Sequence, residues 1–363
     1  GGPVLITRLA RRLARPAAAA CTLALLSRPQ APAEGFASGL LLCTRSLLPA
    51  LFPFFVASAL LTAAPGAELL ARPLLPLARA CGLTGADAAL MLLLSWLGGY
   101  AVCARLAGDA VHAGRMDRDQ AQRFWIVGCC SGPGFVVGCV GGLMLRSVRL
   151  GALLYGLQLA ANFGAAAVLS LAGLLPRTGR QAQSCPPAGG QGDAAGPPLS
   201  LPGAIGNAVD SSLTVCGCVL FFRVMGAVAE SFLPEDAAAA AVLRGLLEVT
   251  AGCDAFAAMG GGAALRGVCL CLSLLGLSVF VQLRALAKLP LSPLLLSRGV
   301  HAVVLQGLVR LCAPALPGEW AAYSSLSRRV VTAARMPPDA AFLLLCFLCA
   351  ALYKAGRKLY NMR

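Results

Sequence analysis

Charged side chains are scarce in this chain. Only 12% of its 363 residues are Asp, Glu, Lys or Arg, whereas 58% are hydrophobic and the mean hydropathy is +0.77. An average soluble domain carries about twice that charged fraction. So few charges could not cover so much apolar surface in water. The composition therefore argues against a soluble protein and predicts that a lipid bilayer surrounds most of the chain.

Histidine and the usual catalytic motifs are also nearly absent. The chain has two histidines and 15 carboxylates. It contains no P-loop, no G-x-S-x-G and no H-E-x-x-H motif, and no strand pattern precedes the glycines of residues 134–138. Nucleotide-binding, serine-hydrolase and zinc-protease chemistry therefore have no support. We expect neither an enzymatic activity nor a cofactor.

The 16 cysteines and the net charge of +15 exclude two further classes. Most cysteines lie in apolar runs, where cysteine acts as a small hydrophobe. The pair Cys346 and Cys349 has no second pair at zinc spacing, so no metal site is expected. The basic residues lie at the margins of apolar runs, as positive-inside topology predicts, and they form no solvated patch for nucleic acid.

Apolar runs of helical length recur along the chain. The fold class is therefore all-α, a polytopic transmembrane helix bundle of roughly ten segments. A short run covers about 16–27, and an amphipathic stretch at 67–80 predicts an interfacial helix. If every segment crossed the membrane once, the basic clusters could not all lie on its cytoplasmic side. One of these two segments must therefore be partial or re-entrant. The protein is predicted to lie in the cell membrane, and the same clusters predict that its C-terminus is on the cytoplasmic side. The longer runs lie at about 38–63, 86–106, 122–145, 150–174, 204–229, 238–259, 263–285, 293–314 and 338–353.

A Pro- and Gly-rich stretch divides the chain and reads as a flexible linker. We predict a basic N-terminal segment with the first short helix, a first repeat, the linker, a second repeat, and a C-terminal region with a loop, the last helix and a basic tail. Their bounds are 1–30, 31–175, 176–202, 203–315 and 316–363.

Two similarities support an internal duplication. Leu51–Phe55 has a counterpart in Val219–Phe222, and the third main segment of each half is interrupted by Gly, Ser or Pro. Interrupted helices in corresponding places indicate a transporter-type site near the bilayer midplane. Chance self-similarity of apolar sequence is the alternative.

The first interruption, Ser131, Gly132, Pro133 and Gly134, is the most informative. Proline removes a backbone donor and clashes with the preceding turn, so the helix must kink or break. In lipid, broken backbone is tolerated only inside protein or around an aqueous cavity. The break therefore either serves packing or faces a solute or ion. The adjacent glycines Gly98–Gly99 likewise indicate close helix approach or a binding role.

The second half carries its own polar candidates. Gly276 interrupts an apolar segment, and Ser278 and Gln282 lie four residues apart on one helical face. Glu248 and Thr250 place a carboxylate and a hydroxyl in another apolar stretch. A carboxylate at membrane depth is a candidate site by default.

Three basic residues leave alternatives open. Arg244 lies four residues before Glu248, so a pair within one helix would explain the carboxylate without a site. Arg298 and His301 begin a predicted helix, where an interfacial location is the simpler interpretation.

These motifs resemble those of the nucleoside-recognition (Gate) family of bacterial membrane proteins, most closely its sporulation integral membrane protein branch. The resemblance covers nearly the whole chain. Ser46–Phe55 is similar to an early Pro-Phe helix of that branch, and Gly98–Arg105 to its Gly-Tyr-Pro turn. Ser131–Phe135 is similar to its Ser-Gly-Pro break. Gly276–Gln282, followed by Arg298 and His301, is similar to its second-half motif.

The chain departs from the family pattern at four positions. Ala101 stands where the family has proline, Cys129 and Cys130 stand where it has small polar residues, and Phe280 stands where it has histidine. Each replacement removes polarity from the expected pathway.

The resemblance implies solute movement. We predict an integral membrane protein that moves or gates a small polar solute across the cytoplasmic membrane and supports spore maturation or cortex formation. Its expected partners are that solute, membrane lipids, and either a second copy or another membrane protein. The alternatives are a non-transporting sporulation scaffold and, against the scarcity of acid–base residues, a membrane-embedded envelope-synthesis enzyme. The expected solute-binding residues are Ser131, Gly132, Pro133, Gly134, Glu248, Thr250, Gly276, Ser278 and Gln282.

Overall fold

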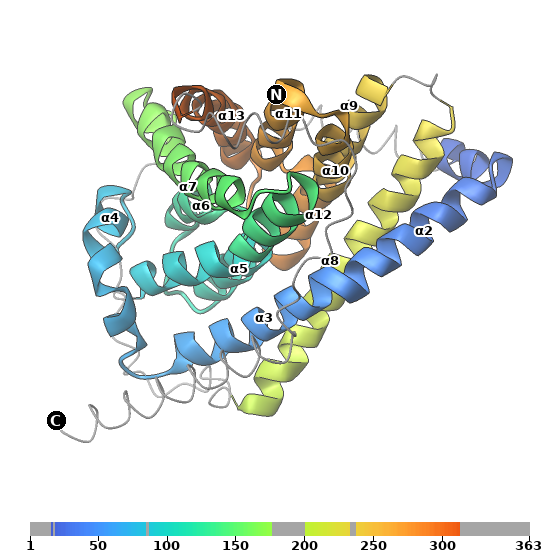
Figure 1. Cartoon of the computed structure of the whole chain (residues 1–363). Coiled ribbons are helices and arrows are strands. Elements are labelled where there is room, and N and C mark those ends of the chain that lie inside the picture. Colours follow the sequence, from blue (N-terminus) through green and yellow to red (C-terminus); the bar gives the residue numbers. More distant parts are fainter. Residues whose placement is uncertain (1–15, 17–18, 85–86, 176–199, 233–236, 313–363) are drawn as a thin grey trace.

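The structure is a computed structural model that describes residues 16, 19–84, 87–175, 200–232 and 237–312. Every regular element within these residues is a helix, as the sequence predicted (Figure 1). The predicted segment at 338–353 and nearly all of the predicted linker lie outside the described residues.

The first half begins with a helix at residues 19–27 and a long bent arm. Pro53 lies inside the helix Leu48–Ala63. A bend of 99° separates Leu51–Ala63 from Ala67–Ala80, so the second stretch is either part of a broken span or a re-entrant loop. The elements are α2 (Gln30–Leu42), the π-helix η1 (Cys43–Leu47), α3 (Leu48–Ala63), the 3-10 helix η2 (Ala67–Leu74), α4 (Leu75–Ala80), α5 (Ala88–His112), α6 (Arg118–Gly128), the π-helix η3 (Gly134–Met144) and α7 (Val148–Leu171).

The second half opens with the longest helix of the described chain. It starts within the predicted linker, because the Ser200 hydroxyl caps it by accepting a hydrogen bond from the Gly203 N–H at 3.3 Å. The elements are α8 (Leu201–Glu230), α9 (Ala237–Leu247), α10 (Val249–Met259), α11 (Gly261–Leu274), α12 (Gly276–Leu286) and α13 (Ser292–Cys312).

Among the described residues, five helices are long and apolar enough to cross a membrane, or six if Leu51–Ala63 and Ala67–Ala80 together form one span. This supports a multi-pass membrane protein. The predicted count of roughly ten is not reached within the described residues. One reason is that the segments at 122–145 and 238–259 are each divided into two short helices, α6 with η3 and α9 with α10.

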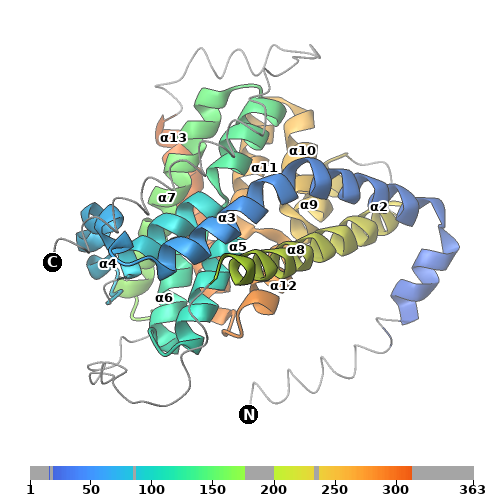
Figure 2. The ribbon, with the colours of Figure 1, turned by 90° about the horizontal axis from the view of Figure 1, so that it is seen from below.

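Two parts of the fold position the site. We call α2, η1, α3 and α8 the arm pair, because α2–α3 and α8 run side by side (Figures 1 and 2). They run in opposite directions, since Gly35 packs against Val224 and Cys43 lies 3.8 Å from the carbonyl of Cys216. The remaining helices from α5 onward form the helix core, in which α7 of the first half packs against α13 of the second.

Candidate functional site

The first half contains two broken segments that meet at their breaks. The α6 helix ends at Gly128 and η3 begins at Gly134, as the sequence predicted. The α5 helix is interrupted at Gly99, with φ of 80° and ψ of −172°. A Cβ atom on Gly99 would lie 3.0 Å from the Gly132 nitrogen. The positive φ together with this close approach requires glycine at position 99, and a Cβ atom on Gly132 would lie 3.2 Å from the Leu97 carbonyl oxygen.

Buried side chains satisfy the carbonyl groups that the first break exposes. Arg298, only 1% exposed on α13, donates to the carbonyls of Cys129 at 3.1 Å and Ile126 at 3.2 Å. It also donates to Asn162 Oδ1 at 2.9 Å, and the Asn162 amide donates to the Val127 carbonyl at 3.0 Å. The interfacial interpretation of Arg298 is wrong, because these acceptors compensate its burial.

A second set of contacts extends this polar cluster. Gln158 on α7 donates to the Ser131 carbonyl at 3.1 Å, and His301 Nε2 donates to the Gln158 carbonyl at 3.2 Å. His301 Nδ1 lies 2.9 Å from the Ser273 hydroxyl. Because a carbonyl only accepts, Nε2 carries a proton. His301 is fully buried, so its interfacial interpretation is also wrong.

Two polar atoms at the first break remain open. Within the described chain, Ser131 Oγ and Gln158 Oε1 are buried without a hydrogen-bond partner. A buried polar atom of this kind requires an explanation such as a bound molecule. Protein donors thus hold the carbonyls of Ile126, Val127, Cys129 and Ser131, and these two side-chain atoms are available to a ligand.

The second half repeats the arrangement of broken segments. The α9–α10 segment breaks at Glu248 and the α11–α12 segment at Leu275, whose φ is 67°. A Cβ atom on Gly276 would lie 3.0 Å from the Gly245 carbonyl oxygen and 3.3 Å from the Glu248 nitrogen. Sequence reasoning found the broken third segment of each half but missed the broken second segments. Two features of the sequence could have indicated these breaks, namely the adjacent glycines Gly98–Gly99 in α5 and Glu248, whose carboxylate caps α10.

Glu248 connects its break to the arm pair. Its side chain is 3% exposed, and its oxygens accept hydrogen bonds from the backbone N–H groups of Thr250 at 2.9 Å and Ala251 at 2.8 Å. Its Oε2 atom lies 3.3 Å from Arg223 Nε on α8. Arg244 pairs with Glu230 instead, at 2.6 Å and 2.7 Å, so the predicted explanation by an Arg244–Glu248 pair is wrong.

The remaining predicted residues lie on α12. Gln282 Nε2 donates to Ser278 Oγ at 3.0 Å, which confirms that the two share a helical face. Gln282 Oε1 is buried without a partner in the described chain. The predicted site residues thus fall into three groups. Ser131–Gly134 lie at the break between α6 and η3, Glu248, Thr250 and Gly276 lie around the break between α9 and α10, and Ser278 and Gln282 form the pair on α12.

One cavity reaches the break at Glu248 between α9 and α10, and we call it the Arg223 cavity. Its volume is about 290 Å³. It lies between the N-terminal part of α2, the C-terminal part of α8, and α9–α10, and three carboxylates and two arginines contribute to its wall. It is lined by Glu34, Gly35, Ser38, Phe222, Arg223, Gly226, Ala227, Glu230, Arg244, Leu247, Glu248 and Ala251.

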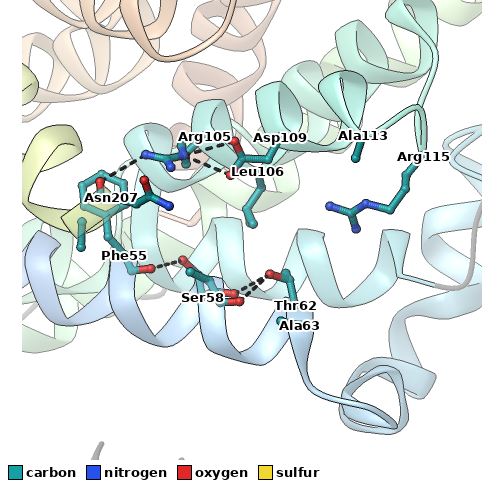
Figure 3. Close-up of a pocket in the computed structure, with 12 residues that line it drawn as sticks. Phe55, Ser58, Thr62, Ala63, Arg105, Leu106, Asp109, Ala113, Arg115 and Asn207 are labelled. Carbon is teal, nitrogen blue, oxygen red and sulfur yellow. Dashed lines mark hydrogen bonds and ion pairs between the residues drawn. The ribbon is translucent and has the colours of Figure 1, made fainter. Parts of the chain in front are cut away.

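A second cavity, the Arg105 cavity, has a volume of about 390 Å³ and lies between α3, α5 and the start of α8 (Figure 3). Arg105 Nε donates to Asp109 at 3.0 Å, and its terminal nitrogen donates to the Asn207 carbonyl at 3.3 Å. No pattern in the sequence indicated this cavity. It is lined by Phe55, Ser58, Ala59, Thr62, Ala63, Arg105, Leu106, Asp109, Ala113, Arg115, Asn207 and Ala208.

Among the described residues, no group of three or more His, Cys, Asp or Glu side chains could hold a metal ion. No protein-family model matches the chain, and no curated protein or solved structure gives a significant match. The family resemblance therefore stays a prediction.

Proposed function

We propose that this chain moves or gates a small polar solute across the cytoplasmic membrane. One observation carries the proposal, namely the Arg223 cavity, in which a helix break and a buried carboxylate paired with a partly buried arginine meet beside an apolar helix of membrane length. Ionisable groups are costly in a bilayer and characteristically mark solute or ion pathways.

The geometry of this cavity suits a polar ligand. The N-terminal end of α10 meets the cavity at Glu248 and Ala251. A broken helix that directs its terminus at a cavity is a recurring way to bind solutes in membranes. Arg223 Nε is buried and makes no hydrogen bond in the described chain, although it lies 3.3 Å from Glu248. The Arg223 side chain as a whole is 20% exposed, so a solute acceptor could bind the accessible part of its guanidinium.

The size of the cavity limits the solute. At about 290 Å³ it is at the lower end of ligand pockets, which span roughly 300–1,000 Å³. A small metabolite fits this volume. The resemblance to the sporulation branch extends the proposal to spore maturation or cortex formation.

A non-transporting scaffold is the second candidate, and one observation favours it. Arg298, Asn162 and Gln158 bind the carbonyls of the first break, so that break needs no solute to stabilise its backbone. A scaffold would keep these contacts and show no uptake.

Uptake into liposomes containing the purified full chain distinguishes the two. The panel comprises labelled nucleosides, small carboxylates and metal ions. We expect uptake of at least one class, and a loss of at least about tenfold in Glu248→Gln and Arg223→Gln, equivalent to about 1.4 kcal/mol. Glu68→Gln on η2, outside both cavities, is the matched control and retains uptake. Normal uptake by both cavity variants would refute the site, and no uptake by intact protein would support the scaffold.

A further inference from the structure

The arm pair carries one cavity near each of its ends, and both lie where the arm pair meets the helix core. α8 contributes Asn207 to the Arg105 cavity and Gly226 to the Arg223 cavity. A rise of about 1.5 Å per residue separates these two positions by about 28 Å along the helix. The hydrocarbon core of a bilayer is about 30 Å thick. If α8 crosses the membrane, the cavities lie near opposite faces.

Both cavities are lined by arginine and carboxylate side chains. Each contains a contact between an arginine and a carboxylate, Arg105 with Asp109 in one and Arg223 with Glu248 in the other. Each also contains a second arginine that pairs with a carboxylate. Arg115 pairs with Asp87, and Arg244 pairs with Glu230.

The apolar walls correspond as well. Phe55 and Phe222 line the two cavities, and they end the similar Phe-containing motifs of the two halves. Four residues later, Ala59 and Gly226 occupy the next turn of each wall. These wall positions therefore correspond between the two proposed repeats, whereas the two arginines for which the cavities are named lie on non-corresponding helices.

Between the cavities the arm pair is closely packed. The Cys43 sulfur lies 3.8 Å from the Cys216 carbonyl, and both residues are buried against Val219. A Cβ atom on Gly39 would lie 3.1 Å from the Leu220 side chain. Small residues of this kind let membrane helices approach closely. This layer separates the two cavities along the arm pair.

We propose that the Arg105 cavity is a second binding site for the solute of the Arg223 cavity, and that the two open to opposite sides of the membrane. The packed layer at Cys43 and Cys216 is then the closed barrier. This inference rests on the proposed function. Each cavity offers guanidinium donors and carboxylate acceptors, so the matching solute class carries both acceptor and donor groups. Zwitterions and neutral molecules rich in hydroxyl or amide groups satisfy this requirement.

The sidedness of the cavities can be measured without knowing the solute. Ser38→Cys places a thiol in the Arg223 cavity and Thr62→Cys one in the Arg105 cavity. Membrane-impermeant maleimide is added to right-side-out or inverted vesicles, and labelling is quantified at each site by mass spectrometry. We expect each site to react at least about tenfold faster from one side, with opposite sides for the two cysteines.

Two further measurements keep the result interpretable. Val303→Cys, 74% exposed on the apolar helix α13, should react from neither side. Ala227→Cys and Ala59→Cys repeat the test at other lining positions if a first variant does not fold. Labelling of both cavities from one side, or of neither before denaturation, overturns the inference.

This result can be separated from that of the uptake assay. Opposite-sided labelling without uptake of any panel member would keep the two-sided arrangement and count against transport. Uptake that depends on Glu248, combined with labelling from one side only, would keep the proposed function and exclude the second site.

Discussion

Arg298 provides the sharpest test of how this fold is held together. Arg298→Met keeps a long side chain but removes every donor. Three hydrogen bonds are then lost, those to the carbonyls of Cys129 and Ile126 and to the amide oxygen of Asn162, and the Cys129 carbonyl keeps only the Asn162 amide as a donor, at 3.3 Å. Water cannot replace the guanidinium readily, because the residue is 1% exposed.

The magnitude follows from the three contacts. Hydrogen bonds between membrane helices contribute about 0.6 kcal/mol on average and about 1.7 kcal/mol at most. Three of them predict a loss of about 2–5 kcal/mol. About 1 kcal/mol shifts the melting temperature of a protein of 150–250 residues by roughly 2–4 °C, which converts this loss into about 4–20 °C. Because the chain has 363 residues, we expect a decrease in the lower part of that range.

The assay is thermal unfolding of the purified full chain in detergent. Arg298→Lys should give an intermediate decrease, because one ammonium group cannot reproduce the fork of a guanidinium. Arg310→Met, at an exposed position in the last turn of the same helix, is the control and should shift the melting temperature by less than about 1 °C. A melting temperature of Arg298→Met equal to that of the control would refute this account of the first break.

Three further predictions concern the break at Gly99, the break at Glu248 and the Arg105 cavity. Gly99→Ala should destabilise the chain more than Gly114→Ala, because both have positive φ but only Gly99 faces another backbone within 4 Å; melting temperatures of the pair test this. Glu248→Ala should cost about 1–2 kcal/mol, because the Thr250 and Ala251 N–H groups lose their cap and the partly buried Arg223 loses its partner, and adding Arg223→Met should recover part of that loss; equal melting temperatures of the single and double variants would contradict the pairing. Arg105→Gln should lower uptake at least about tenfold, as Glu248→Gln does, and unchanged uptake would separate the Arg105 cavity from the pathway.

Much of the architecture was predictable because it depends on local composition. Apolar runs of helical length form helices in a bilayer, so most of the long helices could be placed from the sequence, although α2 begins at Gln30 rather than near residue 38 and two predicted segments are each divided into two short helices. The break at Ser131–Gly134 was also predictable, since Pro133 cannot continue a regular helix. The pairing of Ser278 with Gln282 follows from helical spacing alone.

The partners of the buried charges depended on tertiary structure. Glu248 has a local candidate in Arg244, but helix packing brings Arg223 to it and leaves Arg244 to Glu230. Arg298 was expected at an interface, yet it binds Asn162, 136 positions earlier. No local pattern encodes such a contact, because it forms only when α7 and α13 pack together.

The sequence by itself determined that this chain is helical, apolar and broken at glycine and proline, because each of these properties arises from a residue and its near neighbours. The tertiary structure alone decided which side chains satisfy the breaks and where the two cavities lie. Those features require segments from both halves of the chain to meet, and their separation is set by the length of α8.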